Sequence, residues 1–75
     1  MQVLAWTGYD YEEKTIVDIG SGNLVREGYI IDLYQQKTDD FIQAKVLNIA
    51  YLGNSTEISI YDLNSDKKRI LIMKN

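Results

Sequence analysis

Apolar and polar residues alternate along most of the chain, which is the period of a β-strand and not that of a helix. The segment YIIDLY places Tyr29, Ile31 and Leu33 on one face, and the segments TEISI and FIQAKV follow the same period of two. We therefore expect strand in at least about 45% of the chain, against an average of about 20–25%, and no helix longer than about two turns. The inward faces predict a core of Val17, Ile31, Leu33, Ile42, Val46, Ile58, Ile60 and Ile70.

The alternation changes phase inside one long segment, residues 41–51. Its apolar positions are first Ile42, Ala44 and Val46. The apolar character then continues at the odd positions from Leu47 onward. A slip of one position within a strand indicates a β-bulge or a sharp bend, which small barrels use to carry one strand between two sheets.

Segments rich in Gly, Asn and Asp separate the predicted strands. They are GSGN at 20–23, REG at 26–28 and LGNS at 52–55. The chain has no Pro, so its reversals depend on residues that tolerate unusual backbone angles. We predict that LGNS forms a tight hairpin.

A strand that ends in Tyr, a polar turn and a second strand recur three times. Tyr9, Tyr34 and Tyr61 hold the equivalent places, 25 and 27 residues apart. The recurrence is either a true internal repeat or the same turn chemistry used three times, and we favour the second at this length. The aromatic cluster in WTGYDYEEK is thus interpreted first as hairpin chemistry with cross-strand Tyr pairing.

Six short strands in a meander, one of them bent, predict a small closed or nearly closed β-barrel. The fold class expected is all-β, an SH3-like barrel of five to six antiparallel strands, with an OB-type barrel as the alternative. At 75 residues the chain forms one domain, residues 1–75.

The segment ILIM near the end of the chain is apolar on both faces, with Ile70 and Ile72 on one and Leu71 and Met73 on the other. A barrel has one interior, so one pair is left outside and needs a cover, from the N-terminal residues or from a second copy. We predict a homodimer, formed edge to edge or with these faces packed together. The basic run KKR opposes it, because lysines protect edge strands from pairing.

Composition excludes several kinds of function. Without Cys or His, the chain has no disulfides, no usual zinc site, and neither the commonest catalytic base nor the best nucleophile. The acidic pairs Glu12–Glu13 and Asp39–Asp40 lie in polar turns, so we predict no catalytic residue, no enzymatic activity and no cofactor. The net charge of −3 argues against nucleic-acid binding, and no apolar run approaches the about 20 residues that span a bilayer.

Three short motifs fit structural roles better than ligand binding. GSGNLV opens onto a strand-like segment, whereas a phosphate loop opens onto a helix. Asp62, Asn64 and Asp66 match the first ligand positions of a calcium loop, but Lys67 replaces its Gly and Met73 its bidentate Glu. The run KKR is interpreted as a solvated edge strand. We predict no metal site.

The N-terminus has two interpretations. Residues 2–7 form the first strand, or Val3 and Ala5 mark the end of a signal peptide with Trp6 as the first mature residue. We favour the strand.

The segments AWTGYDYEE, GNLVREGYIIDLY and IYDLNSDKKR resemble a family of small uncharacterised bacterial exported proteins. The resemblance covers Ala5 to about Met73, and its most specific piece is G-N-L-V-R at 22–26. The turns depart from the family pattern, since Gln35 follows the second Tyr in place of Asp and no copy keeps Thr-Gly-Glu. The resemblance implies a periplasmic or secreted location, with the cytoplasm as the alternative, and carries no activity.

Three functions therefore compete. The first is an exported interaction module that contributes a surface or a strand to a bacterial envelope or secretion-related assembly. The second is a carbohydrate or peptidoglycan binder with Trp and Tyr side chains as stacking platforms, and the third is an oligonucleotide-binding barrel. The candidate partner surface comprises Trp6, Tyr9, Tyr11, Tyr34, Tyr61, Leu71 and Met73.

Overall fold

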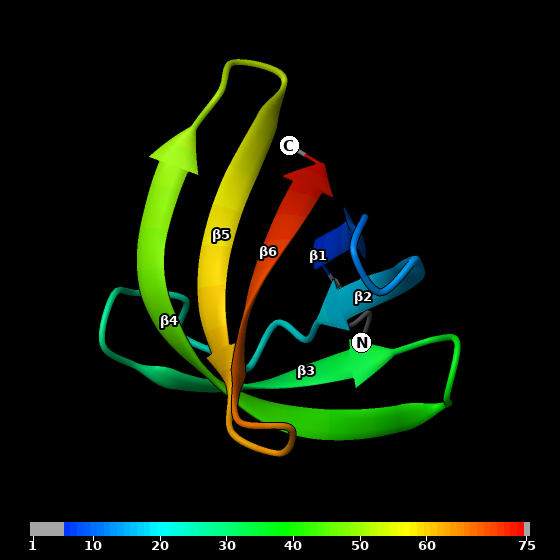
Figure 1. Ribbon diagram of the computed structural model, residues 1–75. Coiled ribbons are helices and arrows are strands. Elements are labelled where there is room, and N and C mark those ends of the chain that lie inside the picture. Colours follow the sequence, from blue (N-terminus) through cyan, green and yellow to red (C-terminus); the bar gives the residue numbers. More distant parts are fainter. Residues whose placement is uncertain (1–5, 75) are drawn as a thin grey trace.

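The computed structural model describes residues 6–74 and contains six strands and, in that part of the chain, no helix (Figure 1). The strands are β1 (Trp6–Asp10), β2 (Thr15–Ile19), β3 (Ile30–Gln35), β4 (Asp40–Tyr51), β5 (Ser55–Asp62) and β6 (Lys67–Lys74). Together they make up more than half of the chain. The predicted strand content is confirmed.

The strands form a closed barrel in chain order, and each is antiparallel to the next. The barrel closes where β1 meets β6, and among residues 6–74 two register pairs join these strands, Gly8 with Met73 and Tyr9 with Ile72. The prediction of a small all-β antiparallel barrel is therefore confirmed. The sequential strand order differs from the Greek-key order of the OB-type alternative.

Strand β4 carries the bulge that the phase slip predicts. Its register with β5 shifts between Val46 and Asn48, and the intervening Leu47 is exposed. The first part of β4 pairs with β3, the later part pairs with β5, and the long curve of the strand is visible in Figure 1. The bulge lets a single strand of 12 residues serve both parts of the sheet.

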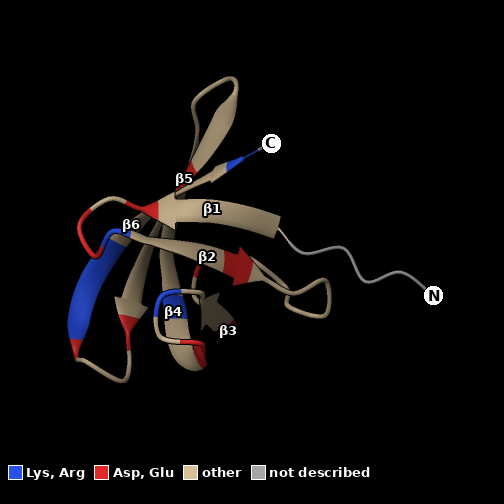
Figure 2. Cartoon of the chain, turned by 90° about the vertical axis from the view of Figure 1, so that its right-hand side faces the viewer, with Lys and Arg blue, Asp and Glu red and all other residues tan. Residues whose placement is uncertain are grey.

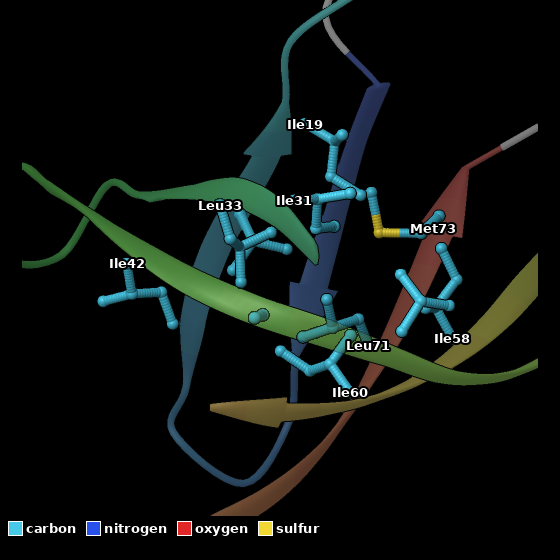
Figure 3. Packing of buried hydrophobic residues seen from close by; sticks show 11 residues of the cluster. Ile19, Ile31, Leu33, Ile42, Ile58, Ile60, Leu71 and Met73 are labelled. Atoms are coloured by element: carbon cyan, nitrogen blue, oxygen red, sulfur yellow. The ribbon is translucent and has the colours of Figure 1, made fainter. Parts of the chain in front are cut away.

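A cluster of buried side chains fills the barrel (Figure 3). Its members are Val17, Ile19, Ile31, Leu33, Ile42, Ala44, Val46, Ile58, Ile60, Leu71 and Met73. Every predicted core residue except Ile70 is among them.

The prediction for Ile70 is wrong, because β6 has the opposite phase. Ile70 is 45% exposed, whereas Arg69, Leu71 and Met73 point inward. Leu71 and Met73, which we predicted as part of a partner surface, are fully buried beside Ile58 (Figure 3).

Strand β6 is not a free edge. It pairs with β5 along its whole length, from Lys74 opposite Ser55 to Lys67 opposite Asp62, and with β1 at Ile72 and Met73. Ile72 and Met73 therefore offer no free edge to a second copy, and edge-to-edge dimerisation through the rest of β6 stays a prediction. Dimerisation by packing of the outer face of β6, which carries the partly exposed Ile70, also stays a prediction.

The described chain begins with Trp6 in β1, so the choice between a first strand at 2–7 and a signal peptide lies partly outside the described residues. The cover that Val3 and Ala5 would give to β6 lies outside them too. Among residues 6–74 there is no helix with the length and apolar character to cross a membrane.

Candidate functional site

Three hairpins gather at one end of the barrel, and they share one backbone geometry. The residue five positions after each recurring Tyr has a positive φ: 56° at Lys14, 52° at Asp39 and 60° at Asp66. Left-handed backbone at a residue other than Gly is uncommon. Its presence at three equivalent places confirms that the three predicted hairpins are built alike.

Side chains lock two of these hairpins in the same way. The hydroxyl of Tyr34 donates to Asp39 Oδ1, and that of Tyr61 donates to Asp66 Oδ1. These bonds raise the pKa of both phenols, because the carboxylate accepts from the protonated hydroxyl. In the first hairpin Lys14 stands in place of the Asp.

Asp10 and Asp62 are the last strand residues before the first and third turns, and their side chains hydrogen-bond to the backbone of these turns. Asp10 Oδ1 accepts from two backbone N–H groups at 3.0 Å, those of Glu12 and Glu13. Asp62 Oδ1 accepts from the N–H groups two and three residues ahead, at 2.8 and 3.0 Å. Each carboxylate thus keeps its second oxygen for another partner.

That partner is Arg69, whose side chain points inward from β6. The residues at the same place in the first and second hairpins, eight positions after the recurring Tyr, are the apolar Val17 and Ile42. Arg69 Nε donates to Asp10 Oδ2 at 2.6 Å, and Nη1 donates to Asp62 Oδ2 at 3.1 Å. All three side chains are buried. The triad ties β1, β5 and β6 together at the hairpin end of the barrel.

Sequence reasoning missed this triad. It placed the run Lys67–Arg69 on a solvated edge, which holds for the exposed Lys67 and Lys68 but is wrong for Arg69. Figure 2 shows this basic stretch of β6 beside the acidic turn between β1 and β2. The usable signal was an Arg at an inward strand position together with an Asp after Tyr9 and Tyr61.

The three hairpins line an open pocket of about 340 Å³, most of whose residues are polar, and we name it the hairpin pocket. Its lining includes Glu13, Gln35, Lys37, Thr38, Asp40 and Arg69. An ion pair between Lys67 and Glu13 stands at its rim and raises the pKa of the Lys67 ammonium.

A second, largely apolar groove lies on the outside of the barrel, next to the β1–β6 closure, and we name it the seam groove. It has a volume of about 290 Å³, and its lining includes Gly8, Tyr9, Tyr11, Ile16, Ile72 and Met73. In the register Tyr9 lies between Ile16 of β2 and Ile72 of β6. Tyr11 and Ile16 are 68% and 41% exposed, so this apolar surface faces solvent.

The sequence comparisons assign the whole barrel to one family. DUF5334, described as a family of unknown function, matches residues 6–75. The chain belongs to DUF5334. No curated protein and no solved structure matches it.

In this DUF5334 barrel the predicted partner residues are dispersed. Tyr9 and Tyr11 meet in the seam groove, with ring centroids 4.7 Å apart at 70°. Trp6 is half-buried against the core, and its Nε1 donates to the carbonyl of Lys74 at 2.5 Å. Tyr34 lies elsewhere, against Phe41.

The calcium-like segment of this DUF5334 member is the turn between β5 and β6. Both oxygens of Asp62 are engaged, one by the turn and one by Arg69, and the hydroxyl of Tyr61 holds Asp66. Within residues 6–74 no group of three acidic, His or Cys side chains is placed to hold a metal ion.

The charge on Asp62 predicts an acid-sensitive contribution to stability. Desolvation opposes ionisation, but the N–H donors of Ser65 and Asn64 and the guanidinium of Arg69 outweigh it, so the pKa of the carboxyl is lowered. A carboxyl with a folded pKa below its unfolded value of about 3.9 stabilises the fold above that pH, and this stability is lost as pH falls through the folded pKa. Asp62→Asn should cost about 2 kcal/mol at neutral pH.

The measurement is the urea midpoint as a function of pH. The difference between Asp62→Asn and the wild type should shrink below about pH 4, as the wild-type carboxyl becomes protonated. Asp32→Asn, at an exposed site on β3, is the control and should follow the wild-type profile. A deficit of Asp62→Asn that stays constant down to about pH 2 would exclude a role for the charge.

Proposed function

We propose that this DUF5334 protein is a non-catalytic interaction module that binds a partner protein through the seam groove. The observation that carries the proposal is the exposed apolar surface of the groove, where Tyr11 and Ile16 are both neighbours of Tyr9. Aromatic side chains that combine an apolar ring with a polar hydroxyl are enriched in the centre of protein interfaces. The polar rim at Asn54, Ser55 and Lys74 resembles the polar margin of such interfaces.

Paired strands form part of the seam groove. Gly8 and Met73 form part of its lining and belong to the pairing that closes the barrel. An interaction surface built on paired strands is pre-organised, and binding then needs little ordering of the free protein. The partner expected is a protein that presents an apolar or aromatic side chain to the groove.

The alternative of a carbohydrate binder that stacks sugar rings on Trp and Tyr side chains has less support. Trp6 packs against the core and Tyr9 meets Tyr11 edge to face, so neither provides a flat platform for a sugar ring. Oligonucleotide binding is disfavoured by the net charge of −3. Export to the bacterial envelope is part of the proposal and is supported by the family resemblance of W-x-G-Y-D and G-N-L-V-R.

A pair of matched substitutions tests the proposal. Tagged protein is isolated from its native host as the wild type, as Ile16→Lys in the groove and as Leu24→Lys outside it; both side chains are exposed. We expect one protein to co-purify in fixed proportion with the wild type and with Leu24→Lys, and to be reduced at least about tenfold with Ile16→Lys. Retention by Ile16→Lys would contradict the proposal, provided that both variants melt within a few degrees of the wild type.

A further inference from the structure

Arg69, a residue of the hairpin pocket lining, has a buried donor without a partner. Arg69 lines the pocket and is only 2% exposed, yet its Nη2 has no hydrogen-bond partner among the described residues. Buried N–H groups are nearly always bonded, and an exception needs a physical explanation.

The threefold recurrence of the hairpins supplies that explanation. Asp10 and Asp62 open the first and third hairpins and bind Nε and Nη1 of Arg69. The equivalent residue of the second hairpin is Gln35. Its Nε2 donates to Asp40 Oδ1 at 3.1 Å and to Thr38 Oγ1 at 3.4 Å, and not to the centre of the barrel. The second hairpin therefore brings no carboxylate to Arg69.

The charges around the pocket select the chemistry of a ligand. The buried triad carries two carboxylates and one guanidinium, a net charge of −1. The lining also contains Glu13, Asp40 and Lys37, and Lys67 forms an ion pair with Glu13, so these four groups add no net charge. An anion would meet a surplus of negative charge. A neutral group that accepts from Nη2 and donates to a carboxylate avoids this cost.

We propose that the hairpin pocket binds a neutral sugar, one of whose hydroxyl oxygens accepts from Arg69 Nη2. A hydroxyl both accepts and donates, so the remaining hydroxyls can donate to Asp40 and Glu13. The hydrogen bonds that Asp40 and Glu13 accept from neighbouring side chains use Oδ1 of Asp40 and Oε2 of Glu13, which leaves the second oxygen of each as an acceptor. The volume of about 340 Å³ lies within the range of small-molecule sites.

This site is separate from the seam groove, because the two linings share no residue. Sugar binding here would not use the aromatic stacking that Trp6 and the tyrosines were expected to provide. Sugar binding in the hairpin pocket is therefore independent of the proposal that a partner protein binds the seam groove.

The test is a titration of the ¹⁵N-labelled full chain with glucose, galactose, mannose and N-acetylglucosamine, followed by amide shifts. At least one of these sugars should give saturable shifts at Glu13, Lys37 and Ser65, in the turns of the three hairpins. The anion glucuronate should bind at least about tenfold more weakly than its neutral counterpart glucose. Absence of saturable shifts with all four neutral sugars, or tighter binding of glucuronate, would overturn the proposal.

Gln35→Asp is the decisive variant. It gives the second hairpin the carboxylate that the other two have, so Arg69 Nη2 gains an internal partner and sugar affinity should fall at least about tenfold. Gln36→Asp, next to it but outside the pocket lining, should bind like the wild type. Asp40→Asn changes an exposed side chain and should also weaken binding, which keeps the test valid if Gln35→Asp does not fold. Unchanged affinity in folded Gln35→Asp, or in Asp40→Asn, would overturn the placement at Arg69.

Discussion

Replacing Arg69 with Met should lower the free energy of unfolding by about 3–5 kcal/mol, the typical effect of removing one member of a buried ion network. The substitution leaves the carboxylates of Asp10 and Asp62 buried without their cation, although the lost side chain is replaced by one of similar length. Small domains have a total stability of about 5–15 kcal/mol, so the variant should be partly or largely unfolded at room temperature. Urea denaturation followed by the fluorescence of Trp6 measures the effect.

A triple variant separates charge from packing. Asp10→Asn and Asp62→Asn keep a side-chain oxygen for the turn N–H groups, so combining them with Arg69→Met removes the charges and retains the turn bonds. Buried ion networks replaced as a unit are often no less stable than the original. We expect the triple variant to recover most of the loss. If Arg69→Met alone stays within about 1 kcal/mol of the wild type, the triad does not hold the barrel together.

Gly8→Ala should be the second large effect, a loss of about 3 kcal/mol. A Cβ at Gly8 would lie 2.6 Å from the carbonyl oxygen of Ile72 and 2.8 Å from Cα of Met73. Both atoms are backbone, so no side-chain rotation relieves the clash. Gly8 belongs to one of the two register pairs that join β1 and β6 in the described part of the chain, so these strands must separate at the place where the seam groove is formed.

Gly22→Ala is the matched control for that substitution. A Cβ at Gly22 meets no atom within 4 Å, so its effect should stay within about 0.5 kcal/mol. Thermal melts of the two variants give the comparison. Equal melting temperatures for Gly8→Ala and Gly22→Ala would show that β1 and β6 do not approach each other as closely as described.

Much of this fold follows from local sequence. Alternation predicts the strands, and the phase slip at Leu47 places the bulge because only one phase is apolar on each side of it. The hairpins are predicted because their turns use contacts only a few residues apart. These features depend on short-range patterns, which a single sequence displays directly.

Alternation alone could not predict which face of β6 points into the barrel. Its segment has apolar residues on both faces and three basic residues before them, so alternation allows Ile70 or Leu71 to point inward. Arg69 settles the choice through Asp10, which is 59 positions away in the sequence. A long-range ion pair leaves no periodic signal.

The seam groove was only partly predictable, for a related reason. Tyr9 and Tyr11, which the N-terminal aromatic cluster had suggested, line the groove, and Ile72 lies beside Tyr9 because the first and last strands close the barrel. Trp6, the most prominent aromatic residue of the sequence, packs inward instead. The site thus arises from the closure of the barrel and not from a motif.

Photo-crosslinking from the seam groove tests the central functional proposal most directly. Benzoylphenylalanine replaces Tyr11 in the groove or, as a control, Tyr51 at the far end of β4; both side chains are highly exposed. After irradiation in the native host, we expect position 11 to give one adduct of defined mass with another protein, absent when Ile16→Lys is present, and position 51 to give none. No adduct at position 11, the same adduct at position 51, or an adduct only with a second copy of the chain would contradict the proposal of a partner protein in the seam groove.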